Sequence, residues 1–127
     1  MTIDYAAGGE LLERFADAWS THDGDAFVGL FADDAEFHPD PFGAPLVGHN
    51  AIRAYLLERS RDEDQAEFTV EQHWVSGSTV LAAWHASVVR SGGARVRLAG
   101  FLTMELGGND RIVRLREWQL ERPSPTG

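Results

Sequence analysis

The sequence predicts a single α+β domain in which a curved antiparallel sheet wraps around three N-terminal helices. In the first 60 residues, apolar residues recur at spacings of three and four, which is the period of helices with one buried face. After residue 65 the spacing changes to two, which is the period of half-buried strands. The 127 residues contain no linker or repeat, so they fit one domain that buries about two thirds of its unfolded surface.

The first two helices are predicted from apolar spacing and from acidic caps. The first helix covers residues 10–21 and follows a frayed lead-in over residues 1–8. A second, short helix is capped by Asp23 or Asp25 and is closed by residues 33–34. The apolar faces consist of Leu12, Phe15, Ala16 and Trp19 in the first helix and of Phe27, Leu30 and Phe31 in the second.

A proline-rich loop separates these helices from the third. A short strand over residues 35–38 leads into the loop. The loop covers residues 39–47, because its three prolines and Gly43 disfavour both helix and strand. The third helix follows, with Asn50 as its N-cap. One side of that helix carries Ile52, Tyr55, Leu56 and Arg59.

The second half of the chain is predicted to form four strands joined by hairpin turns. In the first strand Phe68 and Val70 alternate with polar neighbours, and glycine-containing turns follow each of the first three strands. Helices followed by hairpin-linked strands are typical of an α+β fold. The turns lie at residues 76–78, 91–93 and 107–110, and the strands after them at residues 79–90, 95–106 and 111–121.

Composition excludes several classes of function. Twenty acidic against eleven basic residues give a net charge of −9, which repels nucleic acid and anionic membranes as partners. The absence of cysteine excludes disulfides and thiolate nucleophiles. The N-terminus lacks the pattern of a signal peptide, and no apolar run approaches the roughly 18 residues of a membrane helix, so we expect a soluble, cytoplasmic protein.

No sequence motif indicates a metal or a cofactor. The five histidines show none of the spacings of a zinc site, and the chain has no phosphate loop and no dinucleotide fingerprint. A Ser-His-Asp nucleophile elbow is also absent. We therefore expect any chemistry to depend on carboxylates and histidines without a cofactor.

Three short segments resemble the nuclear transport factor 2-like superfamily. They are FADDA at 31–35, DPFG at 40–43 and AIRAY at 51–55, and the resemblance extends over residues 10–121. It is closest to the polyketide cyclase-like (SnoaL-like) and ketosteroid isomerase branches. The resemblance implies a cone-shaped α+β barrel open at one end, with a ligand cavity between the concave face of the sheet and the helices. It also implies a homodimer through the outer face of the sheet.

The resemblance disfavours two specific activities. Asp40 matches the general base of the steroid isomerases if one residue is inserted, but Phe15 and Leu102 stand where the oxyanion-hole tyrosine and protonated aspartate are expected. Each such donor commonly supplies about 3 kcal/mol of transition-state stabilisation, so steroid isomerisation is disfavoured. Epoxide hydrolysis by an Asp-Arg-Asp arrangement is also disfavoured, because its Arg-x-Asp pair falls on residues 84–87.

Two carboxylates are candidate general bases. Asp40 lies between Pro39 and Pro41, whose stiff backbone and apolar neighbours would desolvate it, although an aspartate before proline is also a common turn residue. Glu117 matches an acid that acts as base on a late strand of the polyketide cyclase-like members. Strand alternation also places it with Val113 and Leu115 on the apolar side, where a carboxylate needs a purpose or an ion-pair partner.

The remaining site candidates have weaker support. His38 precedes Asp40 by two residues and is either a proton relay or an ordinary loop histidine. On one strand either Trp84 or His85 faces inward, because a one-residue slip would exchange them; the isomerase alignment favours Trp84. The candidate substrate-binding walls, which could equally be plain core, are Phe15, Trp19, Tyr55, Trp84, Leu102 and Gln119.

Together these observations predict a cofactor-independent isomerase, cyclase or dehydratase. A carboxylate, Asp40 or Glu117, would act as general base on a small, apolar, carbonyl-bearing molecule. The alternative is a ligand-binding or dimerisation module of the same fold without catalysis. A protein-binding role like that of the transport factor itself is a weaker third possibility.

Overall fold

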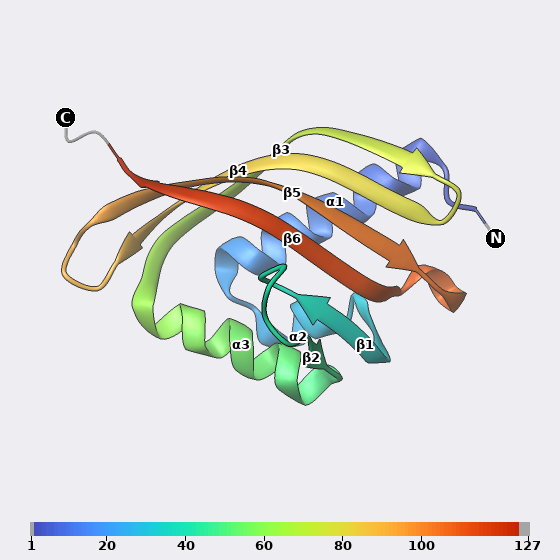
Figure 1. Cartoon of the computed structure of the whole chain (residues 1–127), viewed down its shortest axis with the longest axis horizontal. Helices are drawn as coiled ribbons and strands as arrows, with labels where there is room; N and C mark the ends of the chain where they lie inside the picture. Colours follow the sequence, from blue (N-terminus) through green and yellow to red (C-terminus); the bar gives the residue numbers. More distant parts are fainter. Residues whose placement is uncertain (1, 125–127) are drawn as a thin grey trace.

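The computed structural model describes residues 2–124 and forms an open six-stranded sheet packed against helices. Figure 1 shows the long strands curving over α1, with α2 and α3 on the same side of the sheet. No helix in this part of the chain is long and apolar enough to cross a membrane. The elements are α1 (Tyr5–Thr21), α2 (Gly24–Val28), β1 (Phe31–His38), β2 (Leu46–Val47), α3 (His49–Asp62), β3 (Glu63–Ser76), β4 (Thr79–Arg90), β5 (Arg95–Leu106), the 3-10 helix η1 (Gly108–Asp110) and β6 (Ile112–Pro123).

The sheet confirms the predicted α+β architecture of an open cone. Its strand order is β2-β1-β6-β5-β4-β3, and every pair is antiparallel except β1 and β6, which run parallel. The three hairpins after residue 62 are as predicted. The parallel pair and the short strand β2 were not predicted, because neither produces a hairpin signal in the sequence.

Two helices begin at different residues from those predicted. Helix α1 begins at Tyr5, because Asp4 Oδ1 accepts a hydrogen bond from the Ala7 amide at 2.8 Å and so caps the helix. Residues 5–8 of the predicted lead-in are therefore helical. Helix α3 is capped by Gly48 and not by Asn50; the chain turns there at a φ of 86°, which glycine adopts without strain. Asp23 caps α2, which was one of the two predicted options.

Strand β1 replaces the predicted end of the second helix. Phe31 was assigned to the helix, and residues 33–34 were expected to close it, but both lie in the strand. The pairing of β1 with β6 shifts register between Phe31 and Glu36. Phe31 follows Phe27 by four residues, which is the spacing of a helical face, although it begins the strand.

A second irregularity changes the facing of one residue in β6. Leu115 and Glu117 are buried on the concave side, as alternation predicts, but Val113 is exposed. The register of β5 and β6 shifts between Glu105 and Leu106, which leaves Val113 outside the regular ladder. The prediction for Val113 is therefore wrong, while the facing of Glu117 is confirmed.

Gly100 in β5 allows the strands and the core to approach closely. A Cβ built at this position would meet the backbone oxygen of Trp118 and would lie 2.7 Å from Cζ2 of Trp84. We expect Gly100→Ala to lower the free energy of unfolding by about 1–3 kcal/mol, because neither the strand nor the indole can yield without strain. Urea denaturation checks this.

The matched control is Gly108→Ala, because a Cβ there has no neighbour within 4 Å. We expect that variant to unfold at the wild-type urea concentration. Equal stability of the two alanine variants would contradict the close packing assigned to Gly100.

Candidate functional site

Glu117 is a carboxylate inside the cone. It lies on β6 directly opposite Leu102 of β5, and only 6% of its surface is exposed. Its chain neighbours Arg116 and Trp118 point outward and are exposed. Because side chains alternate along the strand, the ionisable side chain of Glu117 lies on the inner face of the sheet, where burying an unpaired charge is destabilising.

The buried position changes the acidity of Glu117. Burial raises the pKa of this carboxyl from 4.5 to about 7, and the positive charge of Arg59 opposes the rise. Within residues 2–124, no side chain or amide donates a hydrogen bond to Glu117. The group can therefore exchange a proton near neutral pH, as a general base must.

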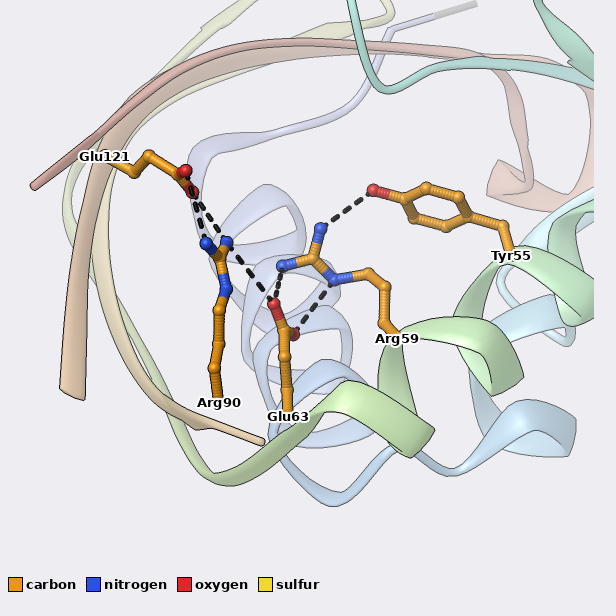
Figure 2. A network of polar contacts seen from close by, with 5 residues as sticks. All are labelled: Tyr55, Arg59, Glu63, Arg90 and Glu121. Carbon is orange, nitrogen blue, oxygen red and sulfur yellow. Dashed lines mark hydrogen bonds and ion pairs between the residues drawn. The ribbon is translucent and has the colours of Figure 1, made fainter. Parts of the chain in front are cut away.

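A chain of polar contacts lies across the end of the cone where α3 ends (Figure 2). Arg59 donates to Glu63 through Nε at 3.1 Å and Nη2 at 2.9 Å, and donates through Nη1 to the Tyr55 hydroxyl at 2.9 Å. Arg90 lies 3.9 Å from Glu63 and forms a 2.6 Å ion pair with Glu121. These five residues, which we call the mouth network, link α3 to the ends of β3, β4 and β6.

Arg59 is held in one position by its surroundings. Its guanidinium lies 5.4 Å from the ring centroid of Trp19 and 5.7 Å from that of Tyr55. Its side chain is 15% exposed, and that of Glu63 is 5% exposed. Burial raises the pKa of Tyr55, and the negative charge of Glu117 contributes to that rise, so the mouth network and Glu117 are electrostatically coupled.

A pocket opens to solvent beside the mouth network. Its volume is ≈ 440 Å³. Arg59, Glu63 and Arg90 belong both to the pocket and to the network, so a molecule that enters here first meets charged groups. The lining residues are Glu58, Arg59, Asp62, Glu63, Arg90 and Ser91.

Trp84, not His85, faces the interior. Trp84 is 2% exposed and stacks on Phe68 with ring centroids 4.8 Å apart. His85 lies on the outer face, where its Nδ1 is 2.7 Å from Glu71 Oε1. The indole nitrogen of Trp84 is buried and has no hydrogen-bond partner among the described residues.

The other predicted wall residues differ in their exposure. Phe15 and Leu102 are fully buried, and Trp19 is 5% exposed, so these three are part of the continuous apolar core. Tyr55 is partly buried, and its ring lies edge-on to that of Phe37, with the ring centroids 5.2 Å apart. Gln119 is exposed. The interior beside Glu117 is therefore closely packed.

Asp40 lies away from Glu117. Its side chain is exposed, and Oδ1 accepts a hydrogen bond from the Phe42 amide at 2.8 Å, which is the geometry of a turn. Phe42 is itself 97% exposed, so the expected apolar enclosure of Asp40 is absent. Asp40 and Gln119 instead line an open surface pocket of ≈ 680 Å³. The structure does not bring the two candidate bases into one enclosed hollow.

His38 is also separated from Glu117. It pairs with Arg116 in the β1–β6 register, and Arg116 is on the outer side of β6. Its Nε2 lies 3.2 Å from Glu36 Oε1. A proton relay from His38 to Glu117 would have to cross the sheet, so the geometry does not favour that role. No group of three metal-ligating side chains occurs within residues 2–124.

The family of the chain follows from a sequence match that spans most of this fold. The family model of the SnoaL-like domain matches residues 12–115, from Leu12 in α1 to Leu115, two positions before Glu117 in β6. The chain belongs to the SnoaL-like family. No curated protein sequence matches this SnoaL-like protein significantly.

Solved structures show the same fold. The SnoaL-like protein superposes on the epoxide hydrolase/cyclase-like enzyme SalBIII of pyran ring formation in salinomycin with a TM-score of 0.82, at 17% identity over 92% of this chain and 93% of that one. A provisionally assigned SnoaL-like polyketide cyclase from Shewanella denitrificans gives 0.79, at 16% identity over 89% and 90%. A protein with a ketosteroid isomerase-like fold from Catenulispora acidiphila, bound to trimethylamine, gives 0.74, at 19% identity over 86% and 84%.

Sequence reasoning missed most of the mouth network of this SnoaL-like protein. Tyr55, Arg59 and Glu63 follow each other at spacings of four, which places them on one side of α3 and its end. That signal was readable, and Arg59 was assigned to the correct side. Arg90 is the direct cross-strand partner of Glu63 on the adjacent strand, whereas its ion pair with Glu121 joins β4 to β6, which are not neighbours in the sheet.

Proposed function

We propose that this SnoaL-like protein is a cofactor-independent proton-transfer enzyme, an isomerase, cyclase or dehydratase, in which Glu117 is the general base. The observation that carries the proposal is the buried Glu117 carboxylate, which has no hydrogen-bond donor in the described chain and a pKa of about 7. The substrate is a small, mostly apolar molecule with a carbonyl group, because Glu117 lies opposite Leu102 on the face of the sheet that packs on the apolar core.

The proposed chemistry begins with removal of a proton from a carbon next to the carbonyl. A base with a pKa near the working pH is ionised in a large fraction of molecules and still has a strong affinity for the proton. The apolar surroundings keep water from competing for the carboxylate. The conjugate acid of Glu117 can then return the proton to another carbon or to a leaving oxygen, which gives isomerisation or dehydration.

The related structures support this proposal without deciding the reaction. SalBIII is described as an epoxide hydrolase/cyclase-like enzyme, and the Shewanella protein as a polyketide cyclase. Both names denote ring chemistry on oxygen-containing carbon skeletons. The mouth pocket is lined by Arg59, whose positive charge acts on the pKa of Glu117, so a molecule bound there would lie next to a group that is electrostatically coupled to the base.

The pH dependence of proton transfer tests the role of Glu117. We expect the protein to catalyse deuterium exchange at the α-carbon of 2-tetralone in D2O, with a rate that rises through pH 7 and levels off above it. The reason is that burial raises the pKa of Glu117 to about 7, so only above that pH is the base largely ionised. NMR spectroscopy follows the exchange, with the rate in protein-free buffer subtracted.

A catalysed rate that does not change between pH 5 and pH 9 would contradict the assignment of Glu117 as the base. The Glu117→Gln variant is the control. If its exchange rate still changed with pH near pH 7, that change would have to come from the titration of another group.

A non-catalytic ligand-binding module is the second candidate, and the close packing of the interior favours it. Phe15 and Leu102 are fully buried, which leaves little free volume beside Glu117. In that case 2-tetralone would raise the melting temperature without exchanging its protons. The predicted homodimer would use the outer face of the sheet, where Trp74, Trp118 and Leu120 are exposed, and it stays a prediction.

A further inference from the structure

Besides the Glu117 carboxylate, the interior of the cone contains a second polar group, the indole N–H of Trp84. Trp84 is 2% exposed, and Nε1 has no partner among residues 2–124. A buried donor without an acceptor is destabilising, and such groups are rare in folded proteins. The stacking of Trp84 on Phe68 involves the faces of the two rings and gives the N–H no acceptor.

The indole of Trp84 lies over β5, the strand next to the one that carries Glu117. Trp84 is paired with Gly100, and Gly100 is paired with Gln119 of β6. The Cε2 and Cζ2 atoms of the indole occupy the space above Gly100 that a side chain would fill. Because Nε1 is bonded to Cε2, the N–H lies above β5, about one strand spacing of 4.8 Å from β6.

Glu117 is on the same concave face of the neighbouring strand. It is two residues before Gln119, so it lies diagonally across the ladder from Gly100. The unpaired Trp84 N–H and the Glu117 carboxylate thus belong to side chains on the concave face of neighbouring strands. They do not form a hydrogen bond with each other.

We propose that the Trp84 N–H and the Glu117 carboxylate together bind one carbonyl group, with the N–H donating to its oxygen and the carboxylate contacting the adjacent C–H. This inference rests on the proposed function and deepens it. Trp84 becomes a catalytic residue because it touches the reacting oxygen. The ligand is a ketone or another carbonyl compound with an acidic α-hydrogen.

The step is a balanced proton transfer. Glu117 takes the proton from the α-carbon, and the electron pair of that C–H bond becomes the carbon–carbon double bond of an enolate. The electron pair of the carbonyl double bond moves to oxygen, where the Trp84 N–H donates a hydrogen bond to the negative charge without transferring its proton. No oxidant, reductant or other reactant is needed. Because Nε1 is buried in the structure, the carbonyl compound must displace the side chains that cover this nitrogen when it binds.

Removing the N–H while keeping the ring tests the proposal. In Trp84→Phe, and in a variant carrying β-(3-benzothienyl)alanine at position 84, we expect the kcat for 2-tetralone exchange to fall about 10²-fold. The second variant keeps the shape of the indole and so remains informative if the phenylalanine variant fails to fold. Its melting temperature should equal or exceed that of the wild type, because the unpaired donor is gone.

Binding of 2-naphthol, a stable analogue of an enol, gives a readout independent of turnover. We expect its Kd, measured by fluorescence, to rise about fivefold in the benzothienyl variant. The control is Trp118→Phe on the outer face, where 40% of the side chain is exposed; its kcat and Kd should match those of the wild type.

The outcomes distinguish this inference from the proposed function. If the benzothienyl variant keeps the wild-type kcat and Kd, the Trp84 role is overturned, whatever Glu117→Gln does. If Glu117→Gln keeps full exchange activity but the benzothienyl variant binds 2-naphthol more weakly, the base assignment fails and Trp84 remains a ligand donor. If both variants lose activity and only the benzothienyl variant loses 2-naphthol affinity, both assignments are supported.

Discussion

Replacing Glu117 with glutamine is expected to lower the rate of α-proton exchange by about 10²–10⁴-fold, the usual contribution of a general base. Glutamine has nearly the same shape as the carboxylic acid, so the interior packing around Leu102 and Leu115 should persist. The measurement is the NMR exchange rate of 2-tetralone at pH 8, where the wild-type carboxylate is largely ionised.

The same substitution should raise stability at pH 8. Because the folded-state pKa of Glu117, about 7, exceeds the ordinary value of 4.5, the native protein binds more protons than the unfolded chain between these pH values. Stability therefore falls as pH rises through this window, by roughly 3 kcal/mol in total. Glu117→Gln should lose that pH dependence, as urea denaturation at pH 4.5 and pH 8 would show. An activity loss accompanied by a stability loss would instead indicate damaged packing.

Asp40→Asn provides the comparison for the base assignment. Asp40 is exposed and accepts a hydrogen bond from the Phe42 amide, which asparagine can also accept. We expect its exchange rate to stay within a factor of about two of the wild-type rate, since general-base catalysis would require a much larger loss. A large loss in Asp40→Asn with full activity in Glu117→Gln would transfer the role of the base to the proline-rich loop.

Replacing Glu63 with glutamine is expected to lower the free energy of unfolding by about 3 kcal/mol. Glu63 accepts two hydrogen bonds from Arg59, and the side chains are 5% and 15% exposed. Removing one member of a buried ion pair leaves the other charge desolvated and uncompensated, which costs about 3–5 kcal/mol. Urea denaturation at pH 7 measures the change.

An exposed ion pair on the same helix is the matched control. Glu58 lies 3.1 Å from Arg61, but these side chains are 71% and 74% exposed. We expect Glu58→Gln to change stability by less than about 1 kcal/mol, because solvent screens exposed pairs. If the two glutamine variants were equally stable, the mouth network would not hold α3 against the strand ends.

The regular parts of the fold could be predicted from the sequence, because each has a local signal. Alternation over β3 to β5 and the glycine turns between them are visible without tertiary information. The ends of α1 and β1 were not predictable in this way. A capping aspartate near the N-terminus looked like part of a loose segment, and Phe31 follows Phe27 at the spacing of a helical face although it begins a strand.

The site was only partly predictable for the same reason. Glu117 was found because the two-residue period of β6 fixes its side of the sheet. The exposure of Asp40 could not be predicted, since it depends on where the loop lies against the sheet and not on its prolines. The mouth network depends on residues far apart in the chain, such as Arg90 and Glu121, that meet through the curvature of the sheet.

The parallel pairing of β1 with β6 leaves one edge of β1 unpaired while the chain is being synthesised. β1 lies between β2 and β6, so one of its edges has no partner until the ribosome has released more than 70 further residues. The nascent chain therefore carries an unpaired strand edge through most of its translation, which is a hazard for aggregation. The bulge at the exposed Asp33 and Asp34 lies in that strand, and its two negative charges hinder edge-to-edge association during this period.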